Sequence, residues 1–110
     1  MSNEELTLHE QTILLSIWRL QDNAYGVTLR ENVMKVTKKN IHYGTLYNTL
    51  NKLVKKGYVE TESGEPTHER GGRRKIYYSL TERGKTALQK ARSLQSALWK
   101  GIPDFDIGVG

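Results

Sequence analysis

Side chains suited to binding nucleic-acid bases and phosphates recur in one stretch, Gly44 to Glu60, which reads GTLYNTLNKLVKKGYVE. At a helical period of 3.6 residues its polar face carries Asn48, Asn51, Lys52 and Lys55. The opposite, apolar face carries Leu46, Leu50, Leu53 and Val54. An asparagine amide can donate to and accept from an adenine edge, and lysine ammonium groups neutralise phosphates. This basic amphipathic helix has three candidate uses: a solvated surface, a membrane surface or a DNA groove.

Two helices are predicted before this stretch, and they must position it. Thr7 and Glu10 form a Thr-x-x-Glu capping box ahead of an apolar run. The residues expected to face the core from the first helix are Ile13, Leu14, Ile17, Trp18 and Leu20. A second helix is predicted from about Thr28, with Leu29, Val33 and Val36 facing the core. Asn40 is the candidate cap of the third helix, and Gly57 is its expected stop.

The stretch is followed by a predicted hairpin and a last helix. YVETES and KIYYSL alternate as strands, with Ile76, Tyr78 and Leu80 on one face. The hairpin tip is basic and contains Arg70, Arg73, Arg74 and Lys75 around two glycines. Thr81 can cap a helix from Glu82 to about Lys100. That helix carries a coiled-coil-like seam of Ala87, Ala91, Leu94 and Leu98, flanked by Leu88, Gln95 and Trp99.

Three helices followed by a hairpin indicate an α+β, mainly helical fold, the winged helix-turn-helix. We expect residues 1–80 to form the winged-helix domain, with three helices and a two-stranded β-hairpin wing. Residues 81–101 are predicted to form a C-terminal dimerisation helix, and residues 102–110 a flexible tail. A chain of 110 residues with 36% hydrophobic content has a small core, so pairing with a copy of itself would bury further surface.

The charge is unevenly distributed along the chain. Residues 35–75 hold ten basic and four acidic side chains, a net charge of +6, whereas residues 1–34 are net −3. Such a concentration is the expected electrostatic footprint of a surface that binds a polyanion. A membrane-surface role is disfavoured because the apolar face of the third helix is needed for the core.

Several function classes lack support in the sequence. There is no cysteine, and His9, His42 and His68 are scattered without metal-ligand spacing, so no metal or cofactor is expected. No nucleophile–base arrangement or phosphate-binding glycine loop indicates an enzyme. The longest apolar run has three residues and the N-terminus is acidic, so we expect neither a membrane span nor a signal peptide, and a cytoplasmic protein.

Three segments, YGVTLREN, GTLYNTLNKLVKKGYVE and GGRRKIYYSLTERGKTAL, closely resemble the PadR-type transcriptional regulators. The resemblance covers about Ile13 to Leu88 and implies a dimeric winged-helix repressor that binds a palindromic, inverted-repeat operator in double-stranded DNA. It also implies DNA contacts by the Thr45–Tyr47 segment and by the wing, and dimerisation by the helix from Glu82. This chain differs in having His42-Tyr43 where the family usually has Ser-Pro, and in a longer, more acidic wing.

Three sets of site residues follow from the pattern and the resemblance together. The candidate DNA-contacting residues are Tyr43, Thr45, Tyr47, Asn48, Asn51, Lys52, Lys55, Arg73, Arg74 and Lys75. The candidate dimer-interface residues are Ala87, Leu88, Ala91, Leu94, Leu98 and Trp99. We expect Trp18 to pack in the core and Trp99 in the dimer interface. A second interpretation is that both tryptophans bind a small aromatic effector between subunits. A protein–protein interaction module and an RNA-binding winged helix remain alternative readings.

Overall fold

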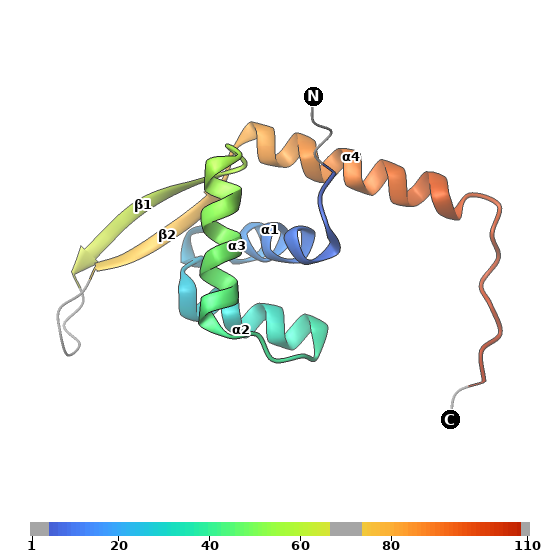
Figure 1. Cartoon of the computed structure of the whole chain (residues 1–110), viewed down its shortest axis with the longest axis horizontal. Helices are drawn as coiled ribbons and strands as arrows, with labels where there is room; N and C mark the ends of the chain where they lie inside the picture. Colours follow the sequence, from blue (N-terminus) through green and yellow to red (C-terminus); the bar gives the residue numbers. More distant parts are fainter. Residues whose placement is uncertain (1–4, 67–73, 109–110) are drawn as a thin grey trace.

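The computed structural model describes residues 5–66 and 74–108. Three helices lie together in the middle of the molecule, while the hairpin and the far half of the last helix extend to opposite sides (Figure 1). In order, the elements are α1 (Leu8–Leu20), the 3-10 turn η1 (Gln21–Asn23), α2 (Gly26–Thr37), α3 (Tyr43–Lys55), β1 (Val59–Pro66), β2 (Arg74–Leu80) and α4 (Glu82–Trp99). The predicted winged-helix arrangement is confirmed. Within the described ranges, no helix combines the length and the apolar character needed to cross a membrane.

The capping box predicted at the start of α1 is present. Thr7 Oγ1 accepts a hydrogen bond from the Glu10 amide over 3.0 Å, and Glu10 Oε1 accepts one from the Thr7 amide over 2.9 Å. Two amides that the helix cannot satisfy internally are therefore paired. The cap also holds the Glu10 side chain on the inner side of the helix. Glu10 is only 6% exposed there.

The core gathers one face of each of the three helices and the base of the hairpin. Its buried apolar members include Ile13, Leu14, Ile17, Leu29, Val33, Leu46, Leu50, Leu53, Val59 and Tyr78. The prediction for Trp18 was wrong: it is 53% exposed at the edge of the buried face, with the Lys85 ammonium 5.8 Å from its ring. Val36 was also wrongly placed, since the last turn of α2 lies beyond Val33 and leaves it exposed.

The hairpin pairs β1 with β2 in antiparallel register, with Val59 opposite Leu80 and Thr61 opposite Tyr78. Its base is joined to the helices because the Tyr78 amide donates to the Ala24 carbonyl over 2.9 Å. Tyr78 is buried there, but Ile76, expected on the same inner face, is 41% exposed. In the half of β2 nearer the tip, the residues that contact the start of α2 are Lys75 and Tyr77, which alternate with Ile76 and point to the other face of the strand.

Two backbone features join α3, the hairpin and α4. After α3, Gly57 has a φ of +81°, its amide donates to the Val54 carbonyl, and the Tyr58 amide donates to the Leu53 carbonyl. This is the Schellman pairing expected of a glycine just past a helix end. Thr81 caps α4 as predicted, since its hydroxyl accepts from the Gly84 amide over 3.0 Å. Gly84 lies so close to the Tyr58 carbonyl that a Cβ would collide with it.

We predict that Gly84→Ala destabilises the fold by about 1–3 kcal/mol, the usual cost of forcing extra atoms into a packed contact. The colliding atom is backbone, so α4 itself must shift away from the end of α3. Gly44→Ala is the matched control, because Gly44 is also in the first turn of a helix but has open space around it. It should be neutral or stabilising by about 0.5–1 kcal/mol. Urea unfolding of both variants measures the difference, and equal midpoints would contradict the close-approach interpretation.

Candidate nucleic-acid interface

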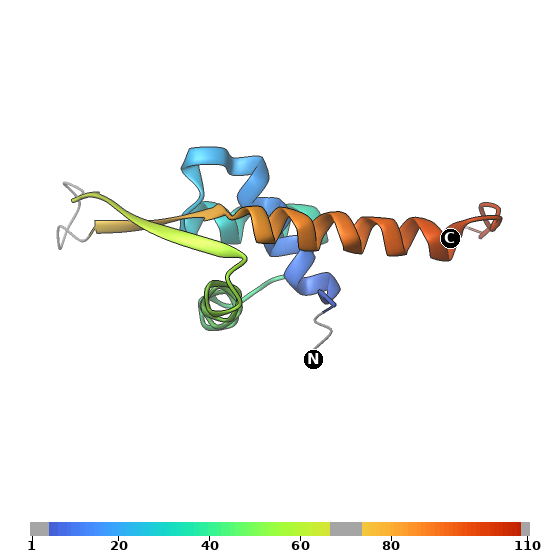
Figure 2. The same ribbon diagram turned by 90° about the horizontal axis from the view of Figure 1, so that it is seen from above.

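The outward face of α3 is the strongest candidate binding surface. The predicted contact residues on this helix are all exposed: Tyr43, Thr45, Tyr47, Asn48, Asn51, Lys52 and Lys55. Their helical neighbours Leu46, Leu50 and Leu53 are fully buried. Seen from above, α3 is viewed almost along its axis on the outside of the other helices (Figure 2). The amides and ammonium groups of this face are therefore presented together to solvent.

The first turn of α3 is not capped in the way the sequence suggested. The N-cap residue is His42, and its side chain makes no capping hydrogen bond, so the expected cap at Asn40 was wrong. Arg30 of α2 holds this end instead. Its Nε donates to the Ile41 carbonyl over 2.6 Å, and its guanidinium lies 4.8 Å from the centre of the Tyr43 ring. One hydrogen bond and one cation–π contact from the same guanidinium thus hold both the α2–α3 turn and the Tyr43 side chain.

Tyr43 and Tyr47 form a stacked pair one turn apart at the same end of α3. Their ring centres are 6.1 Å apart with an interplanar angle of 21°. The Tyr47 hydroxyl packs against Gly26 at the start of α2, in space that any larger residue would occupy. Burial raises the pKa of the neighbouring Tyr78 phenol, and the nearby Tyr47 phenol raises it further. Tyr47 thus packs its hydroxyl against α2 while the residue stays 40% exposed.

Two side chains from the first turn of α1 fix the inner side of α3. His9 Nε2 is 3.0 Å from Thr49 Oγ1, and Lys56 Nζ donates to Glu10 Oε2 over 3.3 Å. Burial raises the pKa of Glu10, but hydrogen bonds from the Thr7 amide and from Lys56 outweigh it, and the pKa ends below its ordinary value of 4.5. Lys56 is therefore engaged in the structure, unlike Lys52 and Lys55 on the outer face.

The half of β2 nearer the wing tip contacts Tyr25, the N-cap residue of α2. The Lys75 ammonium lies 4.3 Å from the centre of the Tyr25 ring, and Tyr25 meets Tyr77 edge-on at 5.5 Å. The predicted wing residue Arg73 lies outside the described residues. Arg74 is the first residue of β2, and its side chain is outside the described part of the chain as well.

The candidate interface residues on α4 divide into two groups. Ala87 and Leu88 are partly buried and pack against the core of their own chain. Ala91 is half-buried, whereas Leu94, Leu98 and Trp99 are 45%, 64% and 51% exposed. Trp99 contacts Phe105 of the C-terminal segment, with ring centres 6.3 Å apart. Trp18 lies instead beside Lys85, about four helical turns away from Trp99 along α4, so one chain does not bring the two tryptophans together.

Several residues that position the site were absent from the sequence-based set. Arg30, His9, Thr49 and Gly26 each act through a partner that is distant in sequence, as in the 40-residue separation between His9 and Thr49. The capping box did indicate Glu10, but only as a local cap. Within the described residues, no group of three or more histidine, cysteine or carboxylate side chains could hold a metal ion.

Comparison with known proteins decides the family. The model of the transcriptional regulator PadR-like family matches residues 14–90. The chain belongs to this family. Its members are regulators of transcription, in agreement with the expectation that the chain is not an enzyme.

Individual relatives agree with this assignment. An uncharacterized HTH-type transcriptional regulator of Methanocaldococcus jannaschii is 44% identical over 50 residues, which are 46% of this chain and 44% of that protein, so the match spans less than half of its length. A transcriptional regulator from Clostridium thermocellum is 28% identical, with a TM-score of 0.65 over 84% of this chain and 87% of that one. A PadR-like transcriptional regulator from Bacillus cereus has a TM-score of 0.70, covering 86% of this chain and 87% of that one. Its sequence is only 20% identical, so this similarity shows the fold alone.

The Glu10–Lys56 contact yields a prediction about stability and pH. Because the folded-state pKa of Glu10 is lowered, its contribution is present above the unfolded pKa and is lost as pH falls through the folded pKa. Glu10→Gln should lower stability by about 1–2 kcal/mol at pH 7, as for a lost charge-assisted hydrogen bond. The difference from wild type should narrow as the pH falls below about 4.5.

Urea unfolding at pH 7 and pH 3.5 provides the measurement. Glu31→Gln is the control, because Glu31 is exposed on α2. This substitution should leave the free energy of unfolding unchanged at both pH values. A deficit of Glu10→Gln that stays constant between the two pH values would show that the carboxylate charge is not what stabilises this contact.

Proposed function

We propose that this protein is a sequence-specific DNA-binding regulator of transcription that acts as a homodimeric repressor. In this proposal α3 enters the major groove, and the wing follows the phosphate backbone or the adjacent minor groove. The observation that carries it is the division of α3 into a buried leucine face and an exposed face of Asn48, Asn51, Lys52 and Lys55. A protein–protein interaction module would not need that concentration of amides and cations.

The homodimer is supported by the apolar side chains at the far end of α4. Leu94, Leu98 and Trp99 extend beyond the core of their own chain and remain exposed. Covering them with a second copy would remove this apolar surface from water. Two α3 helices separated by about one helical turn of DNA, ~34–36 Å, would then read an inverted repeat.

Two substitutions on α3 separate base recognition from phosphate contact. Asn48→Ala should weaken binding to the operator and relax the preference for it, by about 1–3 kcal/mol of discrimination. Lys55→Ala should weaken binding to all DNA sequences alike and reduce the slope of log affinity against log salt by about 1. Gel-shift titrations with the upstream region of the protein's own gene and with scrambled DNA, at several salt concentrations, measure both effects.

Two outcomes of these titrations would contradict the proposal. If Asn48→Ala and Lys55→Ala weakened every sequence equally, α3 would not be reading bases. If an RNA competitor displaced the operator at equal concentration, the RNA-binding alternative would replace the DNA-binding one. Asp22→Asn is the matched control, because Asp22 lies in the exposed turn after α1, away from α3.

The proposal includes a small aromatic effector that binds between the subunits. It rests on the exposed Trp99 ring, which a planar apolar ligand could cover in a dimer, with Trp18 as a further candidate. We predict that such ligands quench tryptophan fluorescence in the wild type and not in Trp99→Phe. Trp18→Phe serves as the second arm and identifies which ring responds. No quenching across a diverse panel of aromatic compounds would remove the effector from the proposal and leave DNA binding untouched.

A further inference from the structure

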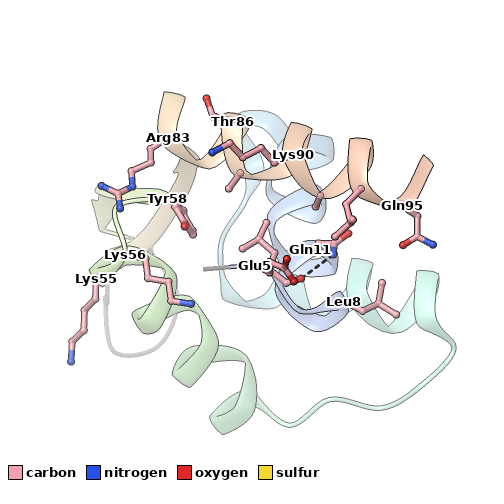
Figure 3. A pocket seen from close by; sticks show the side chains of 14 residues that line it. Glu5, Leu8, Gln11, Lys55, Lys56, Tyr58, Arg83, Thr86, Lys90 and Gln95 are labelled. Carbon is pink, nitrogen blue, oxygen red and sulfur yellow. Dashed lines mark hydrogen bonds between the residues drawn. The ribbon is translucent and has the colours of Figure 1, made fainter. Parts of the chain in front are cut away.

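A broad groove of about 1130 Å³ lies between the start of α1, the end of α3 and the length of α4 (Figure 3). Basic side chains from α3 and α4 line it: Lys55, Lys56, Arg83 and Lys90. Glu5 is the single acidic side chain among its described lining residues, and Lys56 is engaged with Glu10. Apolar side chains, including Leu6, Leu8, Ala91 and Leu94, form much of the remaining wall. The groove therefore combines positive charge with apolar surface.

The C-terminal segment has the complementary character. After α4 the chain reads Ile102-Pro103-Asp104-Phe105-Asp106-Ile107, with two carboxylates between apolar residues. Ile102, Phe105 and Ile107 are 46%, 65% and 72% exposed, although Phe105 contacts Trp99. Apart from the contact between Phe105 and Trp99, most of the apolar surface of this segment is left exposed to solvent.

We propose that the C-terminal segment of one copy docks in this groove of a second copy, with Asp104 and Asp106 facing Arg83 and Lys90. This inference rests on the homodimer of the proposed function and adds that the C-terminal segment stabilises the dimer. Charge complementarity orients the acidic residues toward the basic wall, and burial of Phe105 and Ile107 against the apolar wall supplies the affinity.

Chain length favours a second copy over the same chain. From Arg83 to Lys100, α4 rises about 25 Å at 1.5 Å per residue. From Lys100 the chain reaches Asp106 after at most about 22 Å, even when fully extended and folded straight back. The segment also leaves α4 at the end farthest from Arg83 (Figure 1). Folded back, the segment can reach Lys90 of its own chain, about 15 Å from Lys100, but its backbone stops short of the level of Arg83. The Arg83 end of the groove is therefore the part that a second copy fills better.

A two-fold arrangement brings the segment to the right place in the partner. If two α4 helices cross antiparallel near Leu94, where exposed apolar residues begin, the end of each helix lies against the middle of the other, and Lys100 lies beside the partner's Leu88. The residues after Lys100 then arrive at the partner's Arg83 end of the groove. Tyr58 and Lys55 lie at this end as well, beside the end of α3 (Figure 3).

Engineered cysteines test the contact directly, because the natural chain contains none. An Asp106→Cys protein is mixed with a Thr86→Cys protein, Thr86 being an exposed lining residue of the groove, under mild oxidation. Docking between copies predicts a covalent dimer on a non-reducing gel, formed at least about ten-fold faster than in a mixture with Asp22→Cys. No excess over this control would overturn the proposal. A chain that carries both Asp106→Cys and Thr86→Cys is the second arm. If it formed only an internally cross-linked monomer, docking within one chain would replace docking between copies.

Charge reversal provides the energetic test on the full chain. Asp104→Lys/Asp106→Lys should weaken the dimer about ten-fold by sedimentation equilibrium, since two pairs are lost at each of two symmetric sites. Mixing this variant with Arg83→Glu/Lys90→Glu should restore association, because the mixed dimer has one site with reversed charges and one with the natural charges, and both are attractive. Asp22→Lys is the charge control. An unchanged dimer constant overturns the docking of the segment while leaving the dimer intact. A wild type that is monomeric at all concentrations overturns the homodimer as well, and the operator gel-shift reports separately on DNA binding.

Discussion

Burial of the leucine face of α3 is the constraint on which the rest of the structure depends. Leu46, Leu50 and Leu53 are fully buried, so the helix cannot rotate about its axis without exposing them. At roughly 1.5–3 kcal/mol for each fully buried leucine, that rotation would cost a large part of the stability of a small domain. The exposed position of Asn48 and Asn51 is therefore a consequence of packing on the opposite side.

The two ends of α3 are fixed by different kinds of interaction. Its last turn ends in backbone hydrogen bonds that need the positive φ of Gly57 and little else. Its first turn lacks a side-chain cap and depends on Arg30, which holds the Ile41 carbonyl and the Tyr43 ring. A proline at the first helical position would fix φ without any partner, but this chain has Tyr43 there. In this chain, a contact with α2 takes over the role of that local restraint.

Elements with strong local signals could be predicted from the sequence, and contacts between distant residues could not. The capping box at Thr7, the stop at Gly57 and the cap at Thr81 depend on residues within a few positions of each other. The wrong prediction that Trp18 is buried shows the limit of such local patterns. A residue at the edge of a helical face is buried or exposed according to what packs opposite it. The contact between His9 and Thr49 has no sequence pattern, since it exists only after α1 and α3 have packed.

The net charge of +6 over residues 35–75 overstates the charge available on the outer face of α3. Lys56 pairs with Glu10, a buried acid from the segment that is negative overall, and the Lys75 ammonium lies over Tyr25. Part of the basic surplus thus joins elements of the fold together. Charge totals locate a basic region, but only the direction of each side chain separates cations that bind a polyanion from cations that position the helix presenting them. Lys52 and Lys55, exposed beside Asn48 and Asn51, meet that geometric condition.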